Sequence, residues 1–156
     1  MKIPFVFVFI IGALLFAPCT SAPAYGFFQE SPQLNTEQML SIAEKHYEIA
    51  KLLIKEGRFD LVLPEMRKIL DLNLQGEYEQ SVAESSSLIA RLLAESKQTA
   101  LAQQLLDETL ARMKQCENVA SLLKIKAYLF KSEGKLQKAI DTFEHAVEIE
   151  HQCVQH

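Results

Sequence analysis

One pattern of large and small apolar residues occurs three times in this chain, in copies about 34 residues long, and it limits the folds that the chain can adopt. The clearest copy covers residues 121–150, and Gly134 with Lys135 interrupts it in the middle. On either side of this break, apolar residues recur at helical spacing: Leu123, Ala127 and Phe130, then Ala139, Phe143 and Ala146. This copy predicts two antiparallel helices joined by a tight turn.

Two earlier stretches carry the same pattern. Lys97 and Gln98 stand at the turn of the second copy, and Gly57 and Arg58 stand at the turn of the first. The apolar sites are Ile89, Ala90, Leu93, Ala102, Leu106 and Leu110 in the second copy, and Ile49, Ala50, Leu53, Val62, Met66, Ile69 and Leu70 in the first. Three copies in register predict an all-α chain.

Local signals place several helix ends. Asn35 is a good N-cap, because its side chain accepts hydrogen bonds from the first turn, so we expect the first helix over residues 36–56. Pro64 is tolerated only in the first turn of a helix, which places the start of the next helix at residues 61–63. Residues 73–79 are expected to form the longest joint between copies.

The third copy resembles the tetratricopeptide repeat, whose large and small apolar sites match it. It departs from that pattern at Lys126, where the family prefers Leu, and at His151, where it usually has Pro. The resemblance covers most of the predicted domain, residues 36–156, with repeats at about 43–76, 83–116 and 120–153. It implies a right-handed superhelix of antiparallel hairpins, about six helices, that binds a protein or peptide partner. A generic helical bundle remains the alternative.

The N-terminus has the composition of an export signal. Lys2 precedes an almost wholly apolar run over residues 3–17, and an A-x-A pattern ends at Ala24. This predicts a signal peptide over residues 1–24, followed by an irregular arm over residues 25–35, and a periplasmic or secreted protein. The alternative is an uncleaved membrane anchor on a structural subunit that uses its repeats mainly for oligomerisation.

Charge and motifs argue against several functional classes. Without the leader, the chain carries 15 basic and 20 acidic side chains, so it lacks the basic balance typical of non-specific nucleic-acid binding. No nucleophile–base order, glycine-rich phosphate loop or paired-histidine motif is present in the sequence. We therefore expect no enzymatic activity and no cofactor.

Two cysteines, Cys116 and Cys153, remain after the predicted cleavage. They occupy corresponding positions of the second and third copies, and such sites in stacked hairpins lie about 8–10 Å apart, beyond the roughly 7 Å between Cα atoms that a disulfide accepts. A bridge then requires the helix ends to relax, and both a disulfide and two separate thiols remain open. His151, Cys153 and His156 match no standard zinc spacing, so no metal site is predicted.

Two surfaces are candidates for binding. In the repeat family, the first helix of each hairpin lines a concave wall. Its inward-facing candidates include Glu44, Glu84, Ser87 and Ser121, and the residues expected to bind a partner are Tyr47, Lys51, Ile54, Arg91, Lys124, Tyr128 and Lys131. Tyrosines would supply rigid contact area and the cations would pair with carboxylates. A simple solvated face is the alternative.

The second candidate surface is the C-terminal end. No further polar helix follows the third copy in this sequence, so Ile140, Val147 and Cys153 are expected to be exposed. Exposed apolar residues commonly mark contact sites. We therefore expect this end to support a homodimer.

Overall fold

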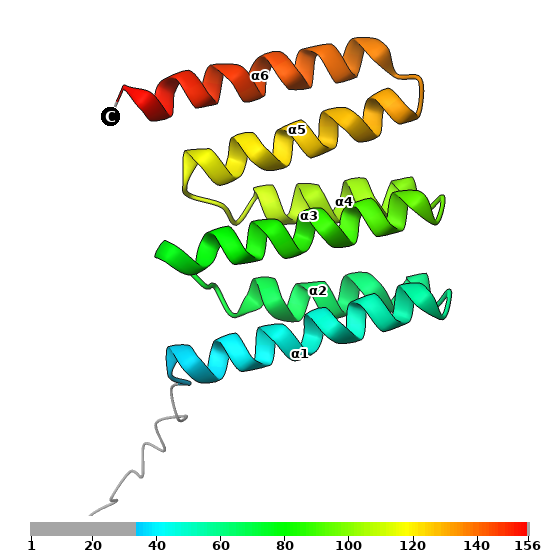
Figure 1. Cartoon of the computed structure of the whole chain (residues 1–156), viewed down its shortest axis with the longest axis vertical. Helices are drawn as coiled ribbons and strands as arrows, with labels where there is room; N and C mark the ends of the chain where they lie inside the picture. Colours follow the sequence, from blue (N-terminus) through cyan, green and yellow to red (C-terminus); the bar gives the residue numbers. More distant parts are fainter. Residues whose placement is uncertain (1–33, 156) are drawn as a thin grey trace, which may run out of the picture. The chain divides into compact units, whose positions relative to one another are not determined.

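The computed structural model describes residues 34–155, and in this part of the chain all regular structure is helical (Figure 1). The predicted leader and most of the arm lie outside the described residues. The α-helices are α1 (Thr36–Lys55), α2 (Val62–Asp71), α3 (Glu79–Glu95), α4 (Thr99–Leu110), α5 (Cys116–Ser132) and α6 (Leu136–Val154), and short 3₁₀ turns cover Phe59–Leu61 and Gly76–Tyr78. The all-α prediction is confirmed.

The predicted start of the first helix is confirmed by its cap. The Asn35 side chain accepts a hydrogen bond from the backbone N–H of Gln38 at 2.8 Å, and the Gln38 side chain accepts one from the Asn35 N–H at 3.0 Å. This reciprocal pair satisfies two N–H groups that the helix itself leaves unpaired. The next helix begins at Val62, within the predicted range, so Pro64 falls in its first turn.

The three predicted turns are also present, and they share one geometry. In each, the residue that follows the C-cap has a positive φ, and the N–H of the next residue donates to a carbonyl in the last helical turn. Gly57, Lys97 and Gly134 have φ values of 74°, 63° and 75°. The returning bonds run from Arg58 to Leu53 at 2.9 Å, from Gln98 to Leu93 at 2.8 Å and from Lys135 to Phe130 at 2.9 Å.

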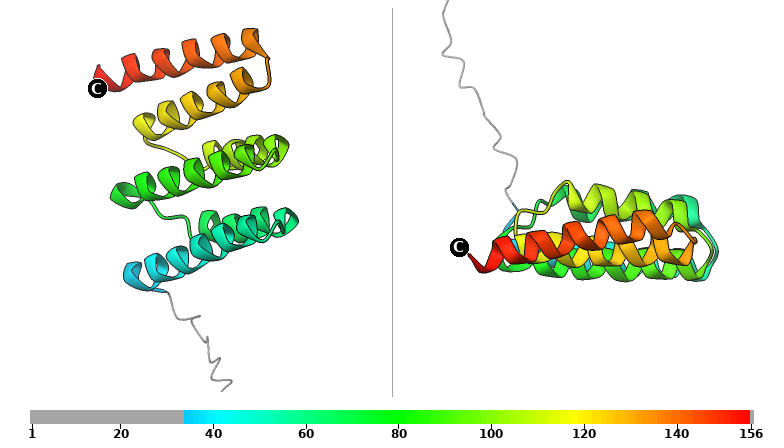
Figure 2. Two further views of the ribbon diagram at one scale, coloured as in Figure 1. Left: turned by 45° about the vertical axis from the view of Figure 1, so that its right-hand side comes forward. Right: turned by 90° about the horizontal axis from the view of Figure 1, so that it is seen from above.

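The helices form three antiparallel pairs, α1 with α2, α3 with α4 and α5 with α6. Helices α1, α3 and α5 are neighbours in one layer, and α2 and α4 lie side by side behind it (Figures 1 and 2). Large side chains that are almost completely buried fill the space between the layers: Met66, Ile69, Ile89, Leu93, Leu105, Leu106 and Leu122. Burial of such side chains is the main driving force for this packing.

Helix α6 departs from the arrangement of the other pairs. Seen from above in Figure 2, it continues the layer of α1, α3 and α5 instead of joining α2 and α4. Its buried residues are the small Ala139 and Ala146, and none of its residues belongs to the main core cluster. The three hairpins begin at residues 36, 79 and 116, several residues before the predicted repeats. The sequence predicted six helices in three hairpins. It did not predict that the third hairpin is arranged differently from the first two.

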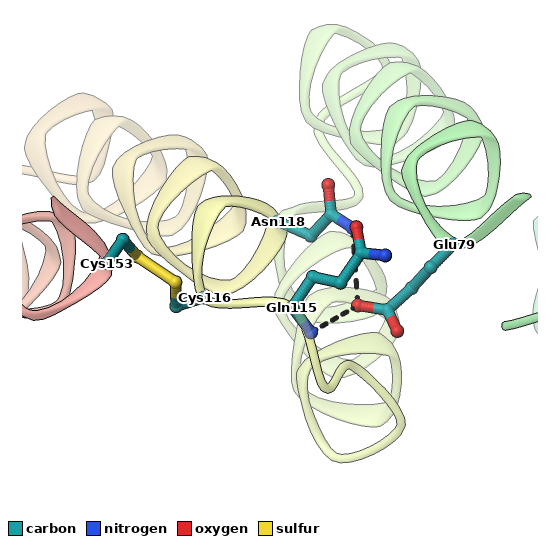
Figure 3. Close-up of a disulfide and its surroundings, with 5 residues drawn as sticks. All are labelled: Glu79, Gln115, Cys116, Asn118 and Cys153. Atoms are coloured by element: carbon teal, nitrogen blue, oxygen red, sulfur yellow. Dashed lines mark hydrogen bonds between the residues drawn. A yellow bond between two sulfur atoms is a disulfide. The ribbon is translucent and has the colours of Figure 1, made fainter. Parts of the chain in front are cut away.

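The two cysteines form a disulfide with a Cα–Cα distance of 5.9 Å (Figure 3). Cys116 begins α5 and Cys153 lies near the end of α6, so they face each other across one antiparallel hairpin. The expected separation of 8–10 Å assumed that Cys116 closes the second hairpin. That assignment was wrong, because Cys116 opens the third.

The membrane anchor that is the alternative to a signal peptide falls on the leader, so it also lies outside the described residues. Among residues 34–155, every helix is too short or too polar to cross a bilayer.

Candidate binding groove

Two hollows lie side by side on the layer formed by α1, α3 and α5. The first, which we call hollow 1, lies between α1 and α3 and has a volume of about 440 Å³. Its lining is mostly apolar and consists of Leu40, Ala43, Glu44, Tyr47, Ile69, Leu74, Ser81, Val82, Glu84, Ser85 and Leu88. Ile69, Leu74 and Val82 are themselves core residues, so the floor of hollow 1 is the hydrophobic core.

Hollow 2 lies between α3 and α5 and has a volume of about 750 Å³. Its lining is more polar and consists of Gln80, Ala83, Glu84, Ser87, Arg91, Gln115, Glu117, Asn118, Ser121 and Ile125. Glu84 lines both hollows, which therefore adjoin along α3. Together they form one groove across α1, α3 and α5, with an apolar part and a polar part.

The charged residues of the groove are mainly acidic. Its lining includes Glu44, Glu84 and Glu117, and Arg91 is the cation beside them. All four side chains belong to exposed residues, and the Gln80 side chain holds that of Glu84 through a hydrogen bond of 2.8 Å. The groove is therefore suited to a partner that brings cations, whereas the sequence-based hypothesis favoured a partner with carboxylates.

Glu79 sets the spacing between the two helices that line hollow 2. This first residue of α3 is only 2% exposed. One of its carboxylate oxygens accepts hydrogen bonds from the backbone N–H groups of Lys114 at 2.9 Å and Gln115 at 2.7 Å, and from the Asn118 amide at 3.2 Å. Figure 3 shows the bonds from Gln115 and Asn118. These bonds attach the start of α5 to the start of α3, and they set the spacing between the two walls.

The same contacts keep Glu79 ionised. Burial favours the neutral acid and by itself raises the pKa of this carboxyl group, but the hydrogen bonds from Gln115, Lys114 and Asn118 together lower the pKa below its ordinary value. Three donors of this chain thus bind one oxygen of the carboxylate. Glu79 therefore acts as a structural anchor of the groove.

The structure places the predicted partner-binding residues in three environments. Tyr47 lines hollow 1 and Arg91 lines hollow 2. Lys51 lies 4.7 Å above the Tyr47 ring and bonds to Glu48 at 2.6 Å, next to hollow 1. Ile54 is buried in the core at 9% exposure, so it is unavailable to a partner.

The remaining three come from α5 and lie toward α6. Lys124 forms an ion pair with Glu150 of α6. The ring of Tyr128 meets that of Phe143 edge to face, with centroids 5.0 Å apart, and Lys131 is exposed in the last turn of α5. Packing of α6 beside α5 thus uses two residues that the sequence had suggested for the groove. Their binding role, like that of Tyr47 and Arg91, stays a prediction.

Sequence reasoning missed most of the apolar lining of hollow 1, including Leu40, Leu74 and Val82. The reason is that an apolar residue at helical spacing is ordinarily assigned to the core, and several lining residues do serve the core as well. The available signal was the spacing of Leu40, Ala43 and Tyr47, which places them on one side of α1.

One group of possible metal ligands lies close together in the described chain, namely Cys116, Glu117 and Cys153. The two cysteines are joined to each other, so neither offers a thiolate here. Comparison with known proteins finds no matching family model, no matching curated protein and no matching solved structure.

Proposed function

We propose that this chain is a non-enzymatic interaction module of the tetratricopeptide-repeat type, which holds a peptide segment of a partner protein in the groove between α1, α3 and α5. The observation that carries this proposal is the pair of adjoining hollows that share Glu84. Grooves of this kind, with an apolar floor and a few charged residues, are typical binding sites for peptides.

The lining defines the chemistry of the segment. Hollow 1 accepts one or two apolar side chains against Leu40, Tyr47 and Leu88. Next to it, Glu44, Glu84 and Glu117 attract Lys or Arg side chains. The partner segment is therefore basic and apolar, and its association weakens as salt screens the charges.

The repeat assignment has support in the three similar turns and in the paired helices, and the position of α6 is its main departure. We further propose that the protein acts outside the cytoplasm, in the periplasm or as a secreted protein. The leader-like sequence motivates this, and the Cys116–Cys153 bridge is of a kind that persists in oxidising compartments. The intact mass of protein recovered from cells tests this point, because loss of residues 1–24 contradicts an anchored form.

A displayed library of random peptides tests the groove. We expect wild-type protein to select peptides rich in apolar and basic residues. A groove variant, Glu84→Lys with Leu88→Gln, should lose them, because it changes one charged and one apolar residue of the lining. The matched control, Glu148→Lys with Leu52→Gln, changes the same residue types at exposed sites outside the two hollows and should bind like wild type.

The selected peptides are then measured by titration at low and high salt. Equal affinity for the groove variant and wild type, with both showing the same helical circular dichroism, would reject the groove as the binding site. Selection of acidic peptides would retain a binding module but reject the proposed partner chemistry.

A further inference from the structure

The outer part of α6 carries a stripe of exposed apolar residues. Leu136, Ile140, Val147 and Val154 are 61%, 50%, 44% and 87% exposed. Their spacing along the helix places all four on one side of it. Phe143 lies in the same stripe and is half-buried against Tyr128. We call this set the α6 stripe; Leu136, Ile140, Phe143 and Val147 follow one another at helical spacing, and Glu150 and His151 stand between them and Val154.

A third hollow lies at one end of the α6 stripe. Hollow 3 has a volume of about 480 Å³ and is lined by Glu117, Val147, Glu150, His151, Cys153 and Val154. Two stripe residues, Val147 and Val154, form its apolar wall. At the opposite end of the same stripe stands Leu136, the first residue of α6, with most of its side chain in solvent. One face thus carries a protruding leucine and a recess for an apolar side chain.

We propose that this face binds a second copy of the chain, with the two α6 helices antiparallel and Leu136 of each copy seated in hollow 3 of the other. A two-fold axis near the middle of α6 exchanges the two ends of the stripe, so the two leucines make equivalent contacts, each in the recess of the other copy. Phe143 and Val147 lie on either side of that axis and meet at the centre. The contact is self-complementary without any change in the fold.

The charges of the hairpin favour the antiparallel direction. The turn between α5 and α6 carries Lys131, Lys135 and Lys138, with Glu133 as the one acid among them. The far end of the hairpin carries Glu117, Glu148 and Glu150, with Lys124 as the cation. An antiparallel pair brings the basic end of one copy to the acidic end of the other, whereas a parallel pair brings like charges together.

This contact differs in part from the sequence-based hypothesis for the C-terminal end. Ile140 and Val147 keep their place in the interface. Cys153 lines hollow 3, but its sulfur is bonded to Cys116, so an intermolecular disulfide plays no part. Leu136 and Val154 were missed, since each lies at an end of the helix, where the repeat pattern places no packing residue.

The first experiment measures mass against concentration by sedimentation, with the full chain purified in the N-terminal form that the cell produces. Wild type is expected to form dimers. Leu136→Gln should raise the dissociation constant by about 100-fold, because the symmetric change removes two buried leucines and each contributes roughly tenfold. Leu52→Gln is the matched control, since Leu52 is 56% exposed on α1 and lies outside the α6 stripe.

The outcomes separate the possible partners of the face. Loss of dimer in Leu136→Gln but not in Leu52→Gln supports the proposal. A monomer at every concentration up to about 0.5 mM, where even weak association with a free energy near 4–5 kcal/mol is detectable, overturns it. Dimers lost only in Leu52→Gln, or open chains of copies lost in both variants, also overturn it, because they place α1 in the contact.

A charge exchange tests the direction of the helices. One variant is Lys131→Glu with Lys135→Glu, and the other is Glu117→Lys with Glu148→Lys; all four residues are exposed. Each variant alone should self-associate more weakly than wild type at low salt, and an equal mixture should regain the wild-type dissociation constant. A mixture that associates more tightly than wild type would show that like charges meet in the wild-type pair, which rejects the antiparallel arrangement.

Discussion

The first two hairpins and the third are built from the same helical pattern but are held together by different interactions. Between α1, α2, α3 and α4, large buried residues such as Met66, Ile89 and Leu106 form a continuous core. Helix α6 instead meets α5 through two alanines, an aromatic pair, an ion pair and a disulfide. The third hairpin, which has little apolar area to bury, therefore relies on a covalent bond for its stability.

Removing the disulfide should have the largest effect on stability, and it should destabilise the third hairpin alone. For Cys116→Ser with Cys153→Ser, the chain-entropy model gives a loss of about 4 kcal/mol for a loop of this length. We expect amide hydrogen exchange in α6 to accelerate strongly while α1 to α4 keep their protection. Equal acceleration in all six helices would mean that the molecule unfolds as one unit and that the disulfide does not hold the third hairpin separately.

A cavity in the first hairpin should accelerate hydrogen exchange in the first two hairpins and not in α6 alone. Met66 is completely buried in the core, so Met66→Ala is expected to lower the free energy of unfolding by about 3 kcal/mol. Because its neighbours belong to the continuous core, exchange should accelerate in α1 to α4 together. Chemical denaturation gives the magnitude, and an effect confined to α2 would contradict the shared core.

The anchor at Glu79 links the second hairpin to the third, so its loss should increase the difference in stability between them. Glu79→Gln removes a charged acceptor of three hydrogen bonds and is expected to cost about 2 kcal/mol at neutral pH.

Titration of Glu79 provides a check on that cost. Because the folded-state pKa of Glu79 lies below its ordinary value of 4.5, its stabilisation is present above pH 4.5 and is lost as the pH falls through the lowered pKa. Unfolding free energies measured across this range should therefore converge for wild type and Glu79→Gln in acid. A constant difference at all pH values would show that the charge of Glu79 contributes nothing.

The smallest effect concerns the turn of the second hairpin. Lys97 has a positive φ where the other two hairpins have glycine, and this conformation costs an L-residue about 1–2 kcal/mol. Glycine loses more conformational entropy on folding than lysine, which offsets part of this gain. Lys97→Gly should therefore stabilise the protein by roughly 0.5–1 kcal/mol. Gly134→Ala is the converse test, since no atom lies within 4 Å of the added Cβ and only backbone strain remains. The midpoint temperature of thermal unfolding should rise for Lys97→Gly and fall for Gly134→Ala.

Much of the helical organisation could be predicted from the sequence because its determinants are local. Asn35 caps its own helix, Pro64 restricts the start of α2, and Gly57 and Gly134 adopt a conformation that other residues avoid. Each of these depends on a few neighbouring residues. For the same reason, the turn at Lys97 was predicted only through its register with the other two.

The groove and the third hairpin were harder to predict because they depend on how helices are placed in space. Glu79 looks like any acid at a helix start, and only the position of the loop at Lys114 and Gln115 shows its role. Tyr128 appears at the right spacing for a binding wall, yet its ring packs against Phe143 of α6 while the residue stays 57% exposed. Helical periodicity defines which residues share a face, but the partner of that face depends on the tertiary packing.

The disulfide also determines what a cut in the chain would do. Residues 131–138, around the turn between α5 and α6, are all exposed, and this stretch includes Lys131, Lys135 and Lys138, at which trypsin-like proteases cleave. Cys116 and Cys153 lie on either side of that turn, so a single cleavage there leaves both fragments covalently joined. Release of α6 from a nicked molecule therefore requires a reductant as well as a protease.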